Sequence, residues 1–350
     1  MPKLEKILSL LAACSIVTWF AVTPALAQMT VADFYRGKNV NLIVGMPVGG
    51  GTDNYARLVA KYISRYIPGN PSIVVQNMPG ATSGRLADYL TKQANKDGSV
   101  IATVDSSLIV APLLTSRALS YDPSRFEYLG SANSDNYMCI VRGDAPVKSF
   151  HDALSQTVIM GAGAPGSSSK SYNFPVFLKN VIGAKFQIVG GYPGSPGISL
   201  AIETGEVQGM CGLSWSTLAA QHPTWLERGT VRVLVQEGLE GHPDLNKKGI
   251  PLTVDFARTE EQRRVMELFY SQNVFGRPFL APEGTPSDRL EALRVAFLSA
   301  LRDQQLLEDA ARARMDVSAI SGGELQPLIA KVYALPQAIR ELAREAISKR

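Results

Sequence analysis

A glycine-rich loop between an apolar run and a helical pattern constrains the fold of this chain more than any other feature. The apolar run at 40–44 (VNLIV) indicates a buried strand, and the loop at 49–53 (GGGTD) leads into apolar residues at helical spacing. Gly45 and Gly50 have the spacing of a phosphate-binding P-loop, but Gly51 occupies the lysine position of that motif. The loop is therefore a poor triphosphate site, yet its backbone N–H groups still favour a smaller anion such as a carboxylate.

The pattern of strand, loop and helix then repeats along the chain. A second apolar run at 72–75 (SIVV), a helical segment at 85–94 and a third run at 100–104 (VIATV) follow the first unit. Strands that alternate with helices predict a parallel sheet with right-handed crossovers. A second series of strands is predicted at 138–141, 157–160, 186–189, 207–211 and 231–235, and helices are predicted at 260–270, 287–301, 304–314, 323–333 and 335–349.

The two series predict an α/β protein of two lobes, each a mainly parallel sheet flanked by helices. The C-terminal helices have no sheet of their own in this interpretation, so we expect them to return to the first lobe. The first lobe then comprises residues 28–134 and 238–350, and the second comprises residues 135–237. Two chain crossings join the lobes, near 131–137 and 236–242. We expect a ligand cleft between the lobes, because ligand sites favour domain interfaces.

The first 27 residues have the pattern of a cleavable secretory signal. Lys3 and Lys6 precede an apolar stretch at 7–22, and residues 25–27 (ALA) match the small-residue cleavage pattern. A membrane anchor is the alternative interpretation, but the stretch is short for a span. Cys14 ends a sequence that resembles a lipoprotein box, and lipid anchoring there ranks second. We therefore expect an exported, periplasmic protein.

Composition and motifs exclude several classes of function. The chain has 35 basic and 31 acidic residues, a net charge of +4 and no long basic run, so we expect no nucleic-acid partner. His151, His222 and His242 lack metal-ligand spacing, the dinucleotide fingerprint fails at its third glycine, and no G-x-S-x-G motif occurs. We expect no metal, no cofactor and no catalytic residue. Cys139 and Cys211 are expected either to pair or to remain buried free thiols.

Four loops share one composition and one position, between a strand and the helix that follows it. They lie at 49–53 (GGGTD), 79–83 (PGATS), 166–169 (GSSS) and 192–195 (YPGS). Helix N-termini present unpaired N–H groups there, and glycine lets a ligand approach the backbone, although ordinary turn chemistry also explains each loop alone. The predicted ligand-binding residues are Met46, Pro47, Gly49, Gly50, Gly51, Thr52, Asp53, Gly80, Ala81, Thr82, Ser83, Ser106, Gly166, Ser167, Ser168, Ser169, Tyr192, Gly194, Ser195 and Trp215.

Two of these residues have a second interpretation. Asp53 has the chemistry of a catalytic carboxylate, but an N-cap at Thr52 or Asp53 explains it with fewer assumptions. Trp215 follows a predicted strand and is expected either to line the cleft or to pack in the core.

Five motifs form an ordered combination that is more specific than any one of them. They are 43–57 (IVGMPVGGGTDNYAR), 74–84 (VVQNMPGATSG), 96–98 (KDG), 205–207 (GEV) and 279–286 (FLAPEGTP). Together they resemble the Bug or TctC-like extracytoplasmic solute receptors of tripartite tricarboxylate transporters, over about residues 28–335. The resemblance implies a two-lobed, type II periplasmic binding protein fold. It implies capture of a small organic carboxylate by the four loops, largely through backbone groups and water, and delivery to membrane permease subunits.

The chain departs from this family pattern in two places. Many members carry an aspartate shortly after the Gly-Glu-Val strand, whereas residues 209–215 read GMCGLSW here, so an amino-acid ligand is not expected. Trp215 is instead suited to stack on a flat or aromatic acid. The segment 337–350 is longer than expected and its role stays open.

Two other functions compete with transport. One is a carboxylate-sensing protein for a membrane signalling receptor. The other is a secreted hydrolase that uses Asp53 with a loop serine. It ranks lower, because no base stands beside a candidate nucleophile in the sequence. The protein is expected to act as a monomer.

Overall fold

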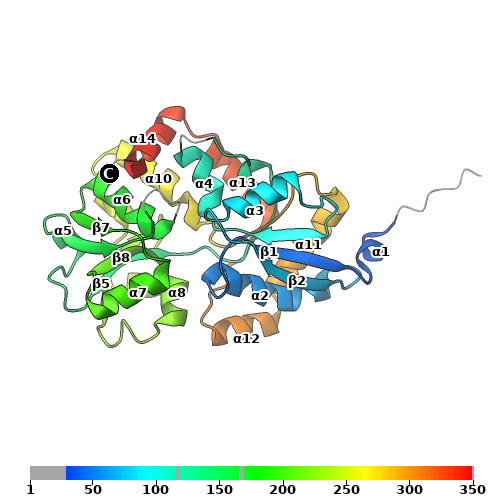
Figure 1. Ribbon diagram of the computed structural model, residues 1–350, viewed down its shortest axis with the longest axis horizontal. Helices are drawn as coiled ribbons and strands as arrows, with labels where there is room; N and C mark the ends of the chain where they lie inside the picture. Colours follow the sequence, from blue (N-terminus) through cyan, green and yellow to red (C-terminus); the bar gives the residue numbers. More distant parts are fainter. Residues whose placement is uncertain (1–28, 116–117, 165–168, 349–350) are drawn as a thin grey trace, which may run out of the picture. The chain divides into compact units, whose positions relative to one another are not determined.

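The computed structural model describes residues 29–115, 118–164 and 169–348 (Figure 1). Residues 31–350 group into one compact unit. A six-stranded sheet has the order β11-β4-β10-β3-β1-β2. Its strands are β1 Asn39–Val44, β2 Ser72–Asn77, β3 Val100–Thr103, β4 Glu127–Ser131, β10 Pro278–Ala281 and β11 Ile320–Ser321.

A second, five-stranded sheet is built from one continuous stretch of chain. Its order is β7-β6-β8-β5-β9. Its strands are β5 Tyr137–Arg142, β6 Val158–Gly161, β7 Phe186–Val189, β8 Gly209–Ser214 and β9 Val231–Glu237. All five strands of this sheet were predicted from the sequence to within three residues at each end, because each is an apolar run.

The predicted parallel pairing is confirmed, but both sheets are mixed. β2 and β3 pair with β1 in parallel, and β7 and β8 pair with β6 in parallel. β5 and β10 run antiparallel to their neighbours. Each of these two strands is the first one after the chain passes from one sheet to the other. Neither follows a crossover helix that would return the chain to the start of the sheet, so each runs opposite to its neighbours. The sequence pattern predicts neither β4 nor the short strands β10 and β11.

The helices cover the faces of the two sheets. Two predicted helices are matched at both ends, α10 and α11, and the predicted segment 335–349 forms α14. The helices α1, α4, α8 and α9 were not predicted. The helix bounds are α1 Val31–Tyr35, α2 Gly51–Ile63, α3 Gly84–Lys92, α4 Ser107–Leu114, α5 Phe150–Ala153, α6 Lys170–Ile182, α7 Ser195–Thr204, α8 Trp215–Gln221, α9 Pro243–Lys247, α10 Glu260–Tyr270, α11 Ser287–Leu301, α12 Gln304–Arg312, α13 Gly322–Tyr333 and α14 Gln337–Ser348.

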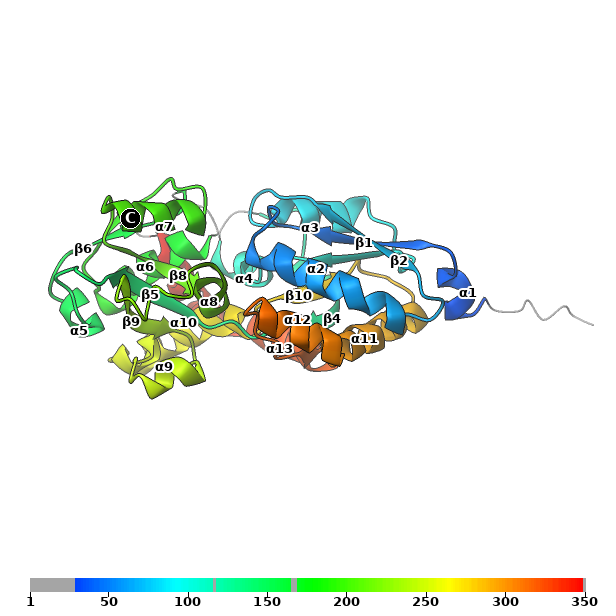
Figure 2. The same cartoon turned by 90° about the horizontal axis from the view of Figure 1, so that it is seen from below.

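Helix α2 shows how the apolar pattern places an element. Tyr55, Val59, Tyr62 and Ile63 are buried at helical spacing, and they pack toward α11 and α12. Figure 2 shows these three helices next to one another. Tyr66 continues the same helical spacing in the sequence, but it is 37% exposed because α2 ends at Ile63. Because its buried face packs against α11 and α12, α2 holds its N-terminus, at Gly51, in the glycine-rich loop.

One apolar core joins helices that flank the two sheets. It includes Leu86 from α3, Phe177 from α6 and Phe269 from α10, with the rings of Phe177 and Phe269 stacked at 3.9 Å. Helix α14 contributes the buried Ala343 and contacts α4, α6 and α10 (Figure 1). Nδ2 of Asn180 donates to the α14 backbone at 2.7 Å. The C-terminal helix is therefore packed rather than solvated on all sides. No helix in the described ranges combines the length and apolar character of a membrane span.

Candidate functional site

The first loop, between β1 and α2, is held by the side chain of Asp53. Its Oδ2 accepts the N–H of Gly49 at 2.8 Å and Nε of Arg57 at 2.9 Å, and its Oδ1 accepts Nδ2 of Asn77 at 2.8 Å. Burial raises the pKa of Asp53, but these donors outweigh it and lower the pKa below its ordinary value. The N-cap is Gly50, so the prediction of Thr52 or Asp53 as cap is wrong. Asp53 lies in the first turn and reaches back to Gly49, as an acidic residue at that position can do.

The second loop, between β2 and α3, is tied to the first by Ser83. Oγ of Ser83 donates to the carbonyl of Gly45 at 3.2 Å and accepts the N–H of Asp105 at 2.9 Å. Three strand ends, those of β1, β2 and β3, are thereby joined by one buried hydroxyl. Since a hydroxyl has a single hydrogen to donate, Ser83 has none left for a ligand.

Residues of the second loop adopt an unusual backbone. Ala81, Thr82 and Ser83 have φ values of 48°, 49° and 70°, in the left-handed region that side chains other than glycine rarely occupy. Gly80 and Ala81 are exposed and Thr82 is half-buried. Gly80 and Ala81 of this loop therefore face solvent, while the hydrogen bonds of Ser83 hold the loop at the start of α3.

The first loop likewise has an exposed tip. Pro47 and Gly49 are exposed, and Met46, Gly50 and Gly51 are half-buried. Thr52 is buried at the start of α2. The first-turn N–H groups of α2 have no acceptor within the helix, and they lie at the carboxyl end of β1, where open α/β sheets bind ligands.

Two loops of the second sheet are also joined. The N–H groups of Gly191 and Tyr192 donate to the carbonyls of Gly163 and Ala162, each at 3.1 Å. Gly194 is the N-cap of α7, which Ser195 begins, and Ser169 is the N-cap of α6. The hydroxyl of Tyr192 donates to Glu206 at 2.6 Å. The predicted residues Gly166, Ser167 and Ser168 lie outside the described residues.

The two groups of loops meet at an ion pair that the sequence analysis did not single out. Nζ of Lys170, the first residue of α6, lies 2.7 Å from Oδ1 of Asp105, which follows β3. Burial raises the pKa of Asp105, but the ammonium of Lys170 and its hydrogen bond outweigh burial and hold the pKa at about 2. Burial lowers the pKa of Lys170, and the charge of Asp105 more than restores it. Both groups are therefore charged at neutral pH.

A second buried ion pair lies where the chain crosses between the sheets. Nη2 of Arg277 lies 2.8 Å from Oδ2 of Asp135, and both side chains are almost fully buried. Burial raises the pKa of Asp135, and the guanidinium of Arg277 opposes that rise. A Cβ added to Gly51 would lie 2.8 Å from Nη2 of Arg277. The guanidinium therefore lies against the first turn of α2, with Asp135 as its counterion.

Neither ion pair is recognisable from sequence, because each joins residues far apart in the chain. Asp105 is adjacent to Ser106, which was predicted, and Lys170 is adjacent to Ser169, so the loops were located correctly while their charged members were missed. Ser106 itself is fully buried, and its Oγ has no hydrogen-bond partner among the described residues.

The sheet order and the meeting of the loops can be compared with known proteins. No family model matches the chain. The UPF0065 protein in the gbd 5' region of Cupriavidus necator is 24% identical over 345 residues, which is 95% of this chain and 94% of that protein. Protein BugT of Bordetella pertussis is 32% identical over 105 residues, 30% of each chain.

Solved structures match this chain over nearly their whole length. The periplasmic binding protein BugD has a TM-score of 0.66 at 20% identity, covering 90% of this chain and 100% of that chain. A TctC solute binding protein from Polaromonas has a TM-score of 0.62 at 22% identity, with 88% and 99% covered. Rpa4515 of R. palustris, solved with adipate, has a TM-score of 0.66 at 20% identity, with 87% and 97% covered.

The fold is that of a periplasmic binding protein. One of these relatives and two of these solved structures carry the Bug or TctC name, so the resemblance seen in the five sequence motifs is confirmed.

In this periplasmic binding protein fold, Trp215 is the first residue of α8. Its ring centroid lies 4.7 Å from that of His242, with the ring planes tilted by 31°, and its backbone N–H donates to the carbonyl of Asn136 at 2.8 Å. The side chain is half-buried at the edge of the second core. One contact of the indole is thus already made by His242, which lies near a chain crossing.

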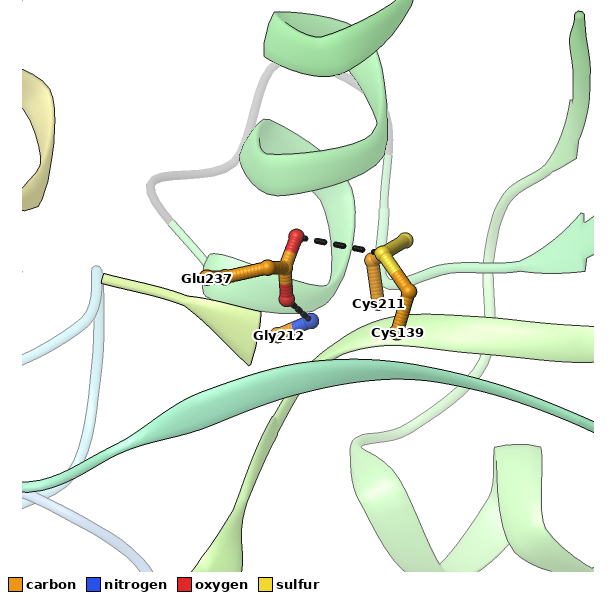
Figure 3. The surroundings of a disulfide bond; sticks show 4 residues. All are labelled: Cys139, Cys211, Gly212 and Glu237. Atoms are coloured by element: carbon orange, nitrogen blue, oxygen red, sulfur yellow. Dashed lines mark hydrogen bonds between the residues drawn. A yellow bond between two sulfur atoms is a disulfide. The ribbon is translucent and has the colours of Figure 1, made fainter. Parts of the chain in front are cut away.

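A buried disulfide with a carboxyl group beside it lies in the second sheet (Figure 3). Cys139 on β5 and Cys211 on β8 form a disulfide. Of the two expected states of these cysteines, the paired state is therefore the one in the structure, and not the buried free thiols. Oε2 of Glu237 accepts the N–H of Gly212 at 2.6 Å, and Oε1 lies 3.3 Å from Sγ of Cys139. Burial raises the pKa of Glu237 to about 8. Because a disulfide sulfur carries no hydrogen, the neutral carboxyl must be the donor in its contact with Cys139.

Cys139, Cys211 and Glu237 have potential ligand atoms within 4.8 Å of one another, a spacing that would suit a metal ion. Metal ions bind cysteine as the thiolate, and the disulfide removes both thiolates. The cluster is therefore a structural crosslink in this state.

Two cavities of the fold lie away from the loops. One, of about 190 Å³, is lined by residues of α6, α10 and α14, and the other, of about 450 Å³, is lined mainly by α10, α13, the segment that leads to α14 and the first turn of α14. Neither contains a predicted ligand-binding residue.

Proposed function

We propose that this protein is a periplasmic solute-binding protein that captures a small organic carboxylate and delivers it to the permease of a tripartite tricarboxylate-type transporter. The observation that carries the proposal is the contact between Asp105 and Lys170 at 2.7 Å. It brings the carboxyl ends of strands from both sheets together, so the loops of both sheets surround one place. Ligands of open α/β folds bind at such strand ends.

The electrostatics of this place favour an anion. The N-termini of α2, α6 and α7 begin at these loops, and each carries about half a positive charge. The guanidinium of Arg277, which is paired with Asp135, also lies next to Gly51. A carboxylate is small enough to be held by backbone N–H groups, as in helix N-terminal anion sites. Rpa4515, a structural neighbour, was solved with the dicarboxylate adipate.

The predicted ligand-binding residues divide into two roles under this proposal. The exposed and half-buried positions at the loop tips, such as Gly49, Gly80 and Tyr192, contact the ligand. Asp53 and Ser83 hold the loops, because their hydrogen bonds are spent within the protein. Residues 28–134 with 238–350 and residues 135–237 are the two lobes that close around the ligand.

The competing functions have weaker support. The partners of Asp53 are a backbone N–H, a guanidinium and a side-chain amide, an arrangement that holds a loop and does not activate a serine. Carboxylate sensing uses the same site as transport, so genes for permease subunits beside this one would favour transport. We propose a monomer in the periplasm, exported by cleavage after Ala27.

A thermal-melt screen tests the proposed function. The protein is unfolded and refolded to remove carried-over ligand, then melted with mono-, di- and tricarboxylates, aromatic acids, amino acids, sugars and nucleotides. A ligand at a hundred times its Kd adds about 2.7 kcal/mol to the free energy of unfolding, which raises the melting temperature by several degrees. We expect a rise with carboxylates alone. A rise with sugars or nucleotides and none with any acid would contradict the proposal.

A further inference from the structure

In the ion pair between Lys170 and Asp105, the ammonium of Lys170 has more hydrogen-bond donors than the described residues use. An ammonium has three N–H donors, and in the described residues that of Lys170 makes one hydrogen bond, to Oδ1 of Asp105. The same Oδ1 also accepts the N–H and the hydroxyl of Ser107, at 2.9 and 2.6 Å. Asp105 is thus held firmly in place, while the other two N–H donors of Lys170 have no hydrogen-bond acceptor among the described residues, and the ammonium lies 5.2 Å from the centre of the Tyr137 ring.

The burial of this pair makes unused donors costly. The side chain of Lys170 is 7% exposed and that of Asp105 is 16% exposed. Buried polar groups are normally hydrogen-bonded, and a buried ion pair is seldom more stable than an apolar pair of the same shape. Stability alone is therefore a poor reason to keep a lysine here.

Other buried polar atoms near the pair also lack partners among the described residues. They include Oγ of Ser106, next to Asp105 in the chain, and Nε of Arg277. The two ion pairs are close enough to interact, since Lys170 lowers the pKa of Asp135 and Arg277 lowers the pKa of Lys170. Donors without acceptors therefore gather where the loops of the two sheets meet.

We propose that Lys170 contacts the ligand carboxylate directly and that Asp105 is its resident counterion, which sets the affinity of the site. This inference rests on the proposed function. The ligand oxygen takes a free N–H of Lys170 while Asp105 keeps another. The carboxylate of Asp105 also repels the arriving anion, so it weakens binding to a level from which the ligand can be released.

Opposite effects of two substitutions test the proposal. The dissociation constants of succinate and adipate are measured by calorimetry for the wild type, Lys170→Met and Asp105→Asn. We expect Lys170→Met to raise Kd at least tenfold, because the direct contact is lost. We expect Asp105→Asn to lower Kd at least tenfold, because the repulsion is lost and Lys170 is freed. A pair that merely latched the two sheets together would weaken binding in both variants, which would overturn the proposal.

Two further variants separate binding from folding. The double variant Asp105→Asn/Lys170→Met leaves no unpaired buried charge, and its Kd should lie below that of Lys170→Met, because the repulsion by Asp105 is removed while the direct contact of Lys170 stays lost. Lys61→Met is the matched control, because Lys61 forms an exposed ion pair with Asp309 at 2.6 Å, and its Kd should stay within twofold of the wild type. Circular dichroism confirms that each variant is folded.

The outcomes distinguish this inference from the proposed function. If the acids bind the wild type and Lys170→Met equally, the inference is wrong and the proposed function stands. If no acid binds the wild type or any variant, both are wrong.

Discussion

At the scale of single residues, two glycines of the first loop face atoms that leave no space for a side chain. A Cβ at Gly45 would lie 2.4 Å from Oγ of Ser83, and one at Gly51 would lie 2.8 Å from Nη2 of Arg277. Ser83 cannot withdraw, because its hydroxyl bridges Gly45 and Asp105. Glycine is needed here for close approach, which the P-loop-like spacing alone did not reveal.

Gly45→Ala should therefore destabilise the protein. Forcing a methyl group against Ser83 should lower the free energy of unfolding by about 1–3 kcal/mol, measured by chemical denaturation. Gly50→Ala is the matched control: its Cβ would meet only a carbonyl at 3.6 Å. As an N-cap change it should cost about 0.5–1 kcal/mol, less than the loss in Gly45→Ala. Equal losses in the two variants would show that the close approach at Gly45 has no cost.

Glu237 should make stability depend on pH. Its pKa is about 8 in the folded protein against an ordinary value of 4.5, so between these values the unfolded chain releases a proton that the folded protein keeps. The free energy of unfolding should then fall as pH rises across this window, by up to about 1.4 kcal/mol per pH unit from this group. Above about pH 8 the contribution levels off.

The variant Glu237→Gln isolates this contribution, because the amide is always neutral and can replace both hydrogen bonds. In chemical denaturation at pH 5, 6.5 and 8, the free energy of unfolding of the variant should increase relative to that of the wild type with each rise in pH. A constant difference between the two proteins at all three pH values would mean that Glu237 does not keep its proton on folding.

At the scale of elements, the disulfide joins two neighbouring strands, β5 and β8, across 72 residues of sequence. Closing so long a loop restricts the unfolded chain, and Cys139→Ala/Cys211→Ala should lower the free energy of unfolding by about 2–4 kcal/mol. Because both sulfurs are fully buried, wild-type protein should need to unfold before a reductant acts. Denaturation of the wild type in reductant should approach the midpoint of the double variant. An unchanged midpoint would contradict a stabilising crosslink.

The elements also show which structure was predictable from sequence. Strands such as β1 and β6 are apolar runs beside glycine-rich turns, so local chemistry defines them. β10 and β11 are four and two residues long, and only their partners across the sheet make them strands. The site divides in the same way: its loops have a local composition, whereas the pairing of Lys170 with Asp105 and of Arg277 with Asp135 exists only in the folded molecule.

At the scale of the whole molecule, the order of the strands sets an order of assembly. β10 lies between β3 and β4 in the first sheet, yet it follows the entire second sheet in the chain. The first sheet therefore lacks its central strand until residues 278–281 pair with β3 and β4. The second sheet comes from one continuous segment, residues 137–237, so its strands can pair without the rest of the chain. Contacts between distant segments form slowly because the intervening loop must close first. The sheet that begins first in the sequence is thus the one completed last, and the unpaired edges of β3 and β4 are the surfaces most exposed to misassociation in the meantime.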